Sequence, residues 1–166
     1  MNLSLCIRHL FPDAVEHVDF VTTQYIDGTV EITEWNLVDP EPTQAELDAA
    51  HFELTKLRQL KLINNTCDTA LAAITAGYPA GELASWDKQE AEARAYLADT
   101  NATVPFIATM ATARGVDVAD LANRIVTKAD AFAGYSAGVI GTRQALEDAL
   151  EAATTVAEVE AVVWPS

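Results

Sequence analysis

Residues 18–36 read VDFVTTQYIDGTVEITEWN. Two runs rich in β-branched and aromatic residues, 18–25 and 29–36, flank the dipeptide Asp27-Gly28. Such runs are typical of strands, and Asp-Gly tolerates the positive φ of a tight hairpin turn. The stretch therefore predicts an antiparallel β-hairpin. Since an isolated hairpin is only marginally stable in water, one of its faces must pack on another element or on a partner.

Strict alternation along the second run predicts which side chains share a face. It places Val30, Ile32 and Glu34 on one face, and Thr33 and Trp35 on the other. The two faces of a strand have different environments when one of them is buried. Trp35 is thus expected on the face opposite Ile32.

A short helix is predicted before the hairpin, at residues 2–11. Its apolar positions are spaced so that they form one helical face: Leu3, Leu5, Ile7, Leu10 and Phe11. Pro12 ends the helix because proline disfavours the helical conformation of the preceding residue. Helix and hairpin together predict a small α+β head, residues 1–42.

A long helix is predicted after the head, from about Gln44. Thr43 and Glu46 have the spacing of a capping box, which satisfies amide donors at a helix start. One apolar stripe then recurs every three or four residues: Leu47, Ala50, Leu54, Leu57, Leu60, Ile63, Cys67, Leu71 and Ile74. Gly77 and Pro79 end it, and the whole of residues 43–166 is expected to be an α-helical body.

Three further helices are predicted in the body before its C-terminal segment. Ser85 is expected to cap a helix that ends at Ala98, and a second helix spans residues 104–114, followed by Gly115 at its C-terminus. Asp117 caps a third, long helix. Apolar residues recur in it at sevenfold spacing, which indicates a heptad seam: Val118, Ile125, Phe132, Val139, Leu146 and Ala153.

The heptad seam can be covered in two ways. Small or polar residues lie four positions on from most seam residues: Ala122, Ala129, Ser136 and Arg143. They favour a close approach of the facing helix, and Gly134, Gly138 and Gly141 favour either close contact or a kink. The facing helix belongs either to an antiparallel bundle within the chain or to a second copy in a self-associating coiled coil.

The last predicted helix is short and begins at a second capping box, Thr155 with Glu158. It leads to Trp164, a large apolar ring near the end of the sequence. We expect this ring to be buried against the helical body.

Composition excludes several classes of protein. The sequence has 10 Lys and Arg against 25 Asp and Glu, a net charge of −15, which repels phosphate backbones and argues against nucleic-acid binding. No stretch approaches the roughly 18 apolar residues of a membrane span, so we expect no membrane association and a cytoplasmic, unprocessed product. Cys6 and Cys67 are expected to be buried, reduced thiols.

One motif suggests an enzyme, and we reject it. Residues 134–138 read GYSAG and match the G-x-S-x-G nucleophile elbow. The elbow must follow a strand, whereas the preceding residues continue a helical heptad, and no histidine follows Ser136. His9, His17 and His51 lack the partners of a zinc site. We therefore expect no catalytic residue, no cofactor and no metal.

The order of residue groups in the first fifty positions resembles a known family. The groups are Phe11-Pro12-Asp13-Ala14-Val15, Phe20-Val21, Asp27-Gly28, Trp35 and Pro42-Thr43-Gln44-Ala45-Glu46-Leu47. This order resembles the XkdW-like proteins of phages and defective prophages, in which a short α/β head with a DG hairpin leads through Pro-Thr into a helix. The resemblance covers about the first third of the chain.

The rest of the chain resembles small phage proteins that are called tail-fibre assembly proteins. Three groups carry this likeness: Ser85-Trp86-Asp87-Lys88-Gln89-Glu90-Ala91-Glu92-Ala93, Ala113-Arg114-Gly115 and Gln144-Ala145-Leu146-Glu147-Asp148. In such families a small protein helps a trimeric tail fibre to fold or attach, and then leaves or remains on the particle. The resemblance implies a tail-fibre chaperone or attachment factor, or else a structural tail component kept in the virion.

The residues expected to bind a tail fibre or another tail protein are Tyr25, Ile32 and Trp35 of the hairpin, and Trp164. Aromatic residues dominate interface hot spots, although Trp35 packed on the first helix is the alternative. The protein is expected in the host cytoplasm during assembly, or in the virion tail. Its helical body is a candidate for homo-oligomerisation.

Overall fold

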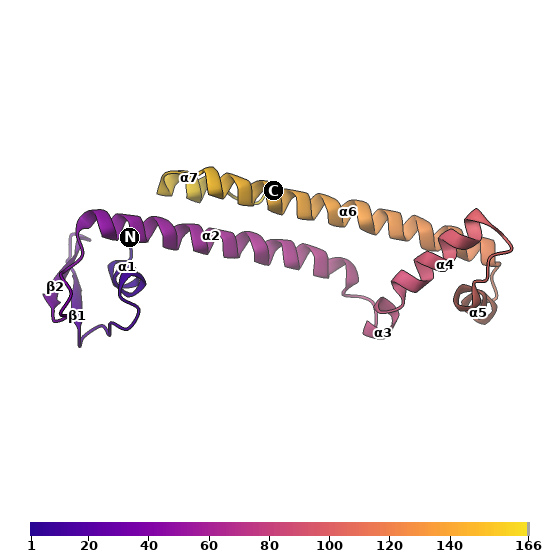
Figure 1. Ribbon diagram of the computed structural model, residues 1–166, viewed down its shortest axis with the longest axis horizontal. Helices are drawn as coiled ribbons and strands as arrows, with labels where there is room; N and C mark the ends of the chain where they lie inside the picture. Colours follow the sequence, from indigo (N-terminus) through magenta and orange to yellow (C-terminus); the bar gives the residue numbers. More distant parts are fainter. Residues whose placement is uncertain (166) are drawn as a thin grey trace. The chain divides into compact units, whose positions relative to one another are not determined.

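The computed structural model describes residues 1–165; Ser166, the last residue of the predicted body, lies outside this range. A small helix and a β-hairpin precede a series of helices, which confirms the predicted α+β class. In chain order the elements are α1 (Leu3–Leu10), β1 (Phe20–Gln24), β2 (Val30–Trp35), α2 (Gln44–Thr75), α3 (Ala80–Leu83), α4 (Trp86–Ala98), α5 (Pro105–Arg114), α6 (Val118–Ala152) and α7 (Val156–Ala161) (Figure 1).

The chain forms two compact units. The first unit contains Met1–Asn64 together with the chain from Ala145 onward, and the second contains Asn65–Gln144. The predicted boundary at residue 42 divides the chain between the hairpin and α2. The two units are instead groups of residues that pack together, and the first unit includes residues from both ends of the chain. That boundary therefore stays a prediction.

The core of the head joins α1, the hairpin and the first turns of α2. Asn2 caps α1, since its side-chain oxygen accepts a hydrogen bond of 3.0 Å from the Leu5 amide. The residues buried in this cluster are Leu3, Cys6, Ile7, Ala14, Phe20, Leu47 and Ala50. The hairpin thus has the packing partner that its marginal stability requires.

The hairpin is antiparallel, as predicted, but it contains a β-bulge. Gly28 at the turn has a φ of 90°. Thr22 pairs with Ile32 and Val21 pairs with Glu34, so Thr33 is an extra residue in β2. The extra residue shifts the alternation, and Trp35 pairs with Phe20 on the core side, where Ile32 also packs. The prediction that Trp35 and Ile32 lie on opposite faces is therefore wrong.

Helix α2 begins where the capping box predicts. The Thr43 amide donates to Glu46 Oε2 at 2.7 Å, and the Glu46 amide donates to Thr43 Oγ1 at 3.3 Å. Most of the predicted apolar stripe is buried or half-buried, but the Leu57 side chain is 56% exposed. Leu57 thus lies on the predicted stripe but outside the core.

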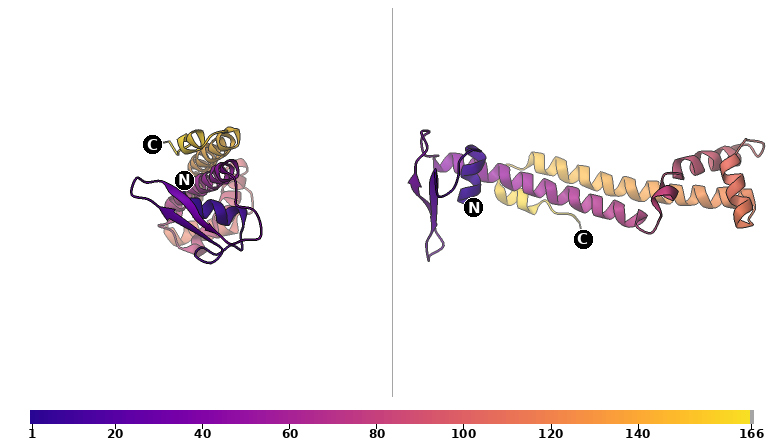
Figure 2. Two further views of the ribbon diagram at one scale, coloured as in Figure 1. Left: turned by 90° about the vertical axis from the view of Figure 1, so that its left-hand side faces the viewer. Right: turned by 90° about the horizontal axis from the view of Figure 1, so that it is seen from below.

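The C-terminal segment of the first unit folds back beside α2 (Figure 2). Ile63 of α2, Leu150 of α6 and Val159 of α7 are the buried residues of this cluster. Trp164 is half-buried and packs against the same cluster, which confirms that its ring is covered by the body. The Thr155 and Glu158 capping box at the start of α7 is also confirmed.

The second unit has its own core, formed by α4, α5 and the first turns of α6. Its buried residues are Ala93, Val104, Ile107, Ala111, Leu121 and Ala122. Gly115 ends α5 with a left-handed φ of 65°, as predicted. Ser85 precedes α4 as predicted, but its side chain makes no capping hydrogen bond to the helix. The short helix α3 was not predicted.

Aromatic rings form a separate contact in the second unit. Trp86, the first residue of α4, meets Tyr78 and Phe132 edge to face, with ring centroids 5.0 Å and 5.8 Å apart. Phe132 is nevertheless 37% exposed.

Helix α6 carries the predicted seam. Asp117 caps it by accepting a hydrogen bond of 2.7 Å from the Ala119 amide. Apart from Phe132, the seam residues and the residues four positions on are buried or half-buried. The seam packs within the chain, since Ile125 joins the core of the second unit and Leu146 joins the cluster around α7. Self-association through this helix stays a prediction.

The three glycines of α6 do not mediate contact within the chain. A Cβ atom added at Gly134, Gly138 or Gly141 would meet no heavy atom within 4 Å apart from its chain neighbours and the nearby backbone of α6 itself. The prediction that they bring a neighbouring helix of this chain into close contact is therefore wrong.

Candidate partner-binding surfaces

The tip of the hairpin displays apolar side chains. Tyr25 is 44% exposed, Val30 is 38% exposed, and Ile26 is fully exposed. The backbone beneath them is well held, because the Tyr25 amide donates to the Thr29 carbonyl at 2.9 Å. Asp27 Oδ1 accepts hydrogen bonds from the Thr29 hydroxyl at 2.7 Å and from the Thr29 amide at 3.0 Å, which lower the pKa of Asp27. The tip is a fixed apolar surface beside a carboxylate.

Ile32 and Trp35, predicted to bind a partner, lie mainly within the head. Both are half-buried against its core. The Trp35 ring meets Phe11 edge to face at 5.3 Å, and its indole N–H donates to the Asp39 carbonyl at 2.7 Å. Their packing leaves only part of each side chain accessible. Ile26 was missed, although an apolar residue beside the Asp27-Gly28 turn was a signal for it.

One edge of the hairpin lacks a neighbouring strand. The sheet has two strands, and no third strand pairs with β2 in residues 1–165. The Tyr25–Thr29 hydrogen bond fixes the alternation of the ladder, so Val30 and Ile32 direct their backbone N–H and C=O groups away from β1. An unpaired edge of this kind can pair with an extended segment of another chain.

The other side of the hairpin is tied to α1 by a partly buried polar link. Glu16 accepts hydrogen bonds from the hydroxyl groups of Ser4 at 2.7 Å and Thr22 at 2.8 Å. These two bonds lower the pKa of Glu16 despite its partial burial. The link holds the strand and the helix together, so its role is structural.

The head and the first turns of α2 carry charge of one sign along most of their length. Between His9 and Thr55 the sequence has no Lys or Arg and eleven carboxylates: Asp13, Glu16, Asp19, Asp27, Glu31, Glu34, Asp39, Glu41, Glu46, Asp48 and Glu53. Such a field attracts basic surfaces and repels acidic ones. Glu31 and Glu34 are exposed on β2 itself.

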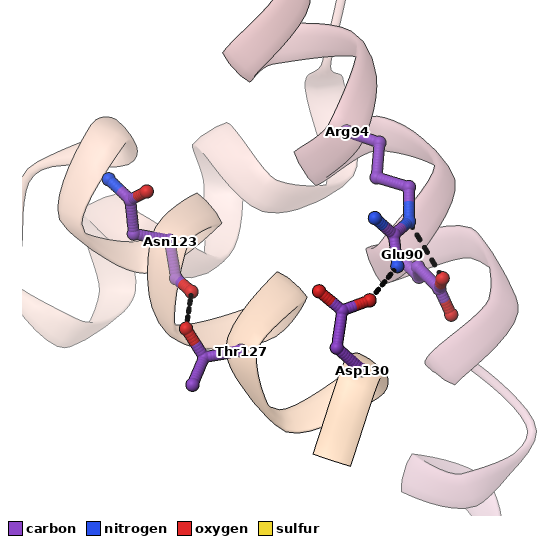
Figure 3. Close-up of polar contacts among 5 residues, drawn as sticks. All are labelled: Glu90, Arg94, Asn123, Thr127 and Asp130. Atoms are coloured by element: carbon purple, nitrogen blue, oxygen red, sulfur yellow. Dashed lines mark hydrogen bonds and ion pairs between the residues drawn. The ribbon is translucent and has the colours of Figure 1, made fainter. Parts of the chain in front are cut away.

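The second unit carries an exposed ion-pair network. Arg94 Nε donates to Glu90 Oε1 at 2.8 Å, and Arg94 Nη2 pairs with Asp130 of α6 (Figure 3). Asp130 and Glu90 raise the pKa of Arg94. On the same helix the Thr127 hydroxyl donates to the Asn123 carbonyl at 2.8 Å (Figure 3). The network joins α4 to α6. Its charged side chains pair with one another, so their arrangement is explained without a bound ligand.

The G-x-S-x-G motif lies wholly within α6. Residues 118–152 are one continuous helix, so the strand and sharp turn of a nucleophile elbow are missing at this point. Ser136 Oγ is buried and has no hydrogen-bond partner among residues 1–165. The motif therefore lacks the geometry that activates a serine in hydrolases.

Other chemistry-bearing residues are scattered. Cys6 and Cys67 are free and buried, and burial raises the pKa of Cys6. His9 and His17 are exposed, and His51 is half-buried. Among the residues that the structure describes, no group of three His, Cys, Asp or Glu side chains could hold a metal ion.

Comparison with known families gives two matches. Residues 3–59 match the family described as XkdW protein, and residues 127–164 match the family described as HI1402 helical domain. The first match spans α1, the hairpin and the first half of α2. No curated protein and no solved structure matches the chain.

Residues 3–59, about a third of the chain, are thus similar to a phage-associated family. More particularly, this part of the chain is an XkdW-like N-terminal module, which confirms the resemblance seen in the first third of the sequence. Neither family description mentions fibre assembly, so the second resemblance stays a prediction. No helix in the described part of the chain is long and apolar enough to cross a membrane.

Proposed function

We propose that this protein is a tail-fibre assembly protein, which binds the fibre as a chaperone or attachment factor. The XkdW-like module supports a phage role. The observation that carries the finer proposal is the exposed apolar tip of the hairpin, with Ile26 at its end, beside a free strand edge. Both features suit a protein whose work is to bind another chain.

The physical task of such a protein matches this surface. Fibre subunits expose apolar surface and unpaired strand edges before they assemble, and these promote aggregation. The edge of β2 would pair with an exposed strand, and Tyr25 and Ile26 would cover adjacent apolar side chains. The carboxylates of the head would select a basic region of the fibre.

A structural tail component retained in the virion is the alternative. It would use the same hairpin surface, because binding during assembly and binding in the particle need the same contacts. The two roles differ in how long the protein stays bound, so an experiment must measure residence.

The test combines a pull-down with mass spectrometry of purified particles. Tagged protein is recovered from lysate of infected cells, and the particles are analysed for the same chain. Recovery of the fibre, with the protein absent from particles, would support a departing chaperone. A defined copy number in particles would support the structural alternative, and absence from both would overturn the phage-tail proposal.

A pair of variants locates the binding surface. Ile26→Asp should reduce fibre recovery at least tenfold, because it places a charge at the apolar tip. Leu97→Asp is the matched control: Leu97 is 43% exposed on α4, outside the head, and the substitution adds the same charge. Equal recovery with both variants would show that the hairpin tip is not the contact.

A further inference from the structure

Within the first unit, α7 packs against both α2 and α6. Val159 of α7 is fully buried against Ile63 and Leu150. Polar contacts lie at the margin of this packing surface: Gln59 Nε2 donates to the Val162 carbonyl at 2.6 Å, and Arg58 pairs with Glu160 at 3.3 Å. Here α2 and α6 bind a short amphipathic helix, α7, through apolar contacts and an ion pair between Glu160 and Arg58.

A groove between α2 and α6 is open. Its margin is mainly acidic, whereas α7 meets the cation of Arg58. The groove has a volume of about 270 Å³, and its lining residues all come from α2 and α6: Glu53, Lys56, Leu57, Leu60, Glu147, Leu150 and Glu151. None belongs to α7. The three leucines give it apolar walls, and Leu57 is 56% exposed there.

Charge at the margin of the open groove favours a basic occupant. Three glutamates and one lysine line it, and Lys56 Nζ lies 5.9 Å from the centre of the Phe52 ring. That cation–π contact engages the lysine with α2 itself. A second copy of this chain, with its net charge of −15, would be repelled.

We propose that the open groove between α2 and α6 binds an amphipathic helix of a partner protein, in which Lys or Arg residues flank an apolar stripe. Apolar side chains of that helix would contact Leu57 and Leu60. Its cations would pair with Glu53 and Glu151. This mode of recognition is a helix in a groove, and the site is separate from the hairpin surface and does not depend on the proposed function.

The test uses a designed helical peptide of about 14 residues, with a leucine stripe flanked by lysines and a fluorescent label. Binding to the full chain is followed by fluorescence anisotropy at physiological ionic strength. A second peptide has glutamate at every lysine position. The lysine peptide should bind saturably, and the glutamate peptide at least tenfold more weakly. Failure of the lysine peptide to bind, or equal binding of the two peptides, would overturn the proposal.

Matched variants separate the groove from general attraction to an acidic protein. Leu57→Asp should weaken binding at least tenfold, whereas Leu62→Asp should leave it within twofold, because Leu62 is 52% exposed on the same helix but does not line the groove. Glu151→Lys should weaken binding at least threefold, and Asp148→Lys, which makes the same charge change outside the groove, should not.

The two pairs of variants test the proposal independently. Circular dichroism checks that each variant is folded; should Leu57→Asp unfold, the Glu151→Lys and Asp148→Lys pair still decides. Equal affinities within both pairs would show that the peptide binds elsewhere. Sedimentation of the free protein is the last control, since self-association that Leu57→Asp abolishes would assign the groove to a second copy and overturn a foreign partner.

Discussion

Glu92 shows how one side chain in the second unit completes a helix that lies further along the chain. Helix α5 has no capping side chain at Val104, and Glu92 of α4 accepts hydrogen bonds from the amides of Phe106 at 2.8 Å and Ile107 at 3.0 Å. The Glu92 side chain is 12% exposed. Burial alone would raise its pKa, but hydrogen bonds from Ile107, Lys88 and Phe106 outweigh burial and lower the pKa.

Replacing this carboxylate should destabilise the second unit. Glu92→Ala leaves two amide donors of α5 without their partner, so we expect a loss of about 1–2 kcal/mol in the free energy of unfolding. Urea unfolding followed by circular dichroism measures it. Glu90→Ala is the control, because an exposed ion pair with Arg94 contributes little to stability. Equal losses would show that Glu92 acts only through surface charge.

At the scale of the element, the glycines of α6 lie inside a continuous helix although glycine disfavours helix formation. Glycine inside a helix costs conformational entropy, and a Cβ at Gly138 would meet open space. Gly138→Ala should therefore raise the free energy of unfolding by about 0.5–1 kcal/mol, measured by urea unfolding.

Gly115→Ala provides the opposite control, because its φ of 65° is left-handed. That change should lower the free energy of unfolding by about 1 kcal/mol. A destabilising effect of Gly138→Ala would contradict an open surface at this face of α6 and would favour the coiled-coil alternative, in which the glycine contacts a second copy.

The bulge in β2 makes a prediction about the hairpin as an element. Deleting Thr33 removes the unpaired residue but keeps Trp35 opposite Phe20, so the head should retain its fold. Deleting Glu31 instead removes a paired residue and turns Ile32 toward solvent. Thermal unfolding should therefore be affected far more by the Glu31 deletion. Similar melting temperatures for the two deletions would refute this view of the register.

At the scale of the whole molecule, several carboxylates should make stability depend on pH. Hydrogen bonds from hydroxyl or amide groups lower the pKa values of Glu16, Glu46 and Glu158 below 4.5, as they do for Glu92. A lowered folded-state pKa stabilises the protein above the unfolded-state value, and this contribution is lost as the pH falls below 4.5 and these groups take up protons.

The free energy of unfolding should accordingly be steady around neutral pH and fall below about pH 4.5. Urea unfolding at a series of pH values from 7 to 3 measures it. A net charge of −15 opposes this effect, since protonation relieves repulsion. Stability that rises steadily toward pH 3 would show that repulsion outweighs the hydrogen-bonded carboxylates.

Local motifs account for the features that the sequence predicted. The Asp27-Gly28 turn, the Thr43 and Glu46 capping box and Gly115 each specify a conformation through neighbouring residues, and all three are found. The family resemblance of the N-terminal third includes the first two of these motifs.

The features that sequence analysis missed depend on contacts between distant residues. The face of Trp35 depends on which β1 residue it pairs with, and a bulge changes that pairing without any signal in β2 alone. Periodicity placed Leu57 on an apolar stripe but could not say which part of the stripe α7 would cover. The Glu92 cap needs α4 and α5 to meet, and the open groove needs α2 and α6 to do so.

The three tryptophans lie in three different packed regions of the protein. Trp35 contacts Phe11 and Phe20 in the head, Trp164 lies in the cluster around α7, and Trp86 meets Tyr78 and Phe132 edge to face in the second unit. Each region thus has its own intrinsic fluorophore. Variants that keep one tryptophan at a time would reveal whether these regions unfold together or in succession, without any added label.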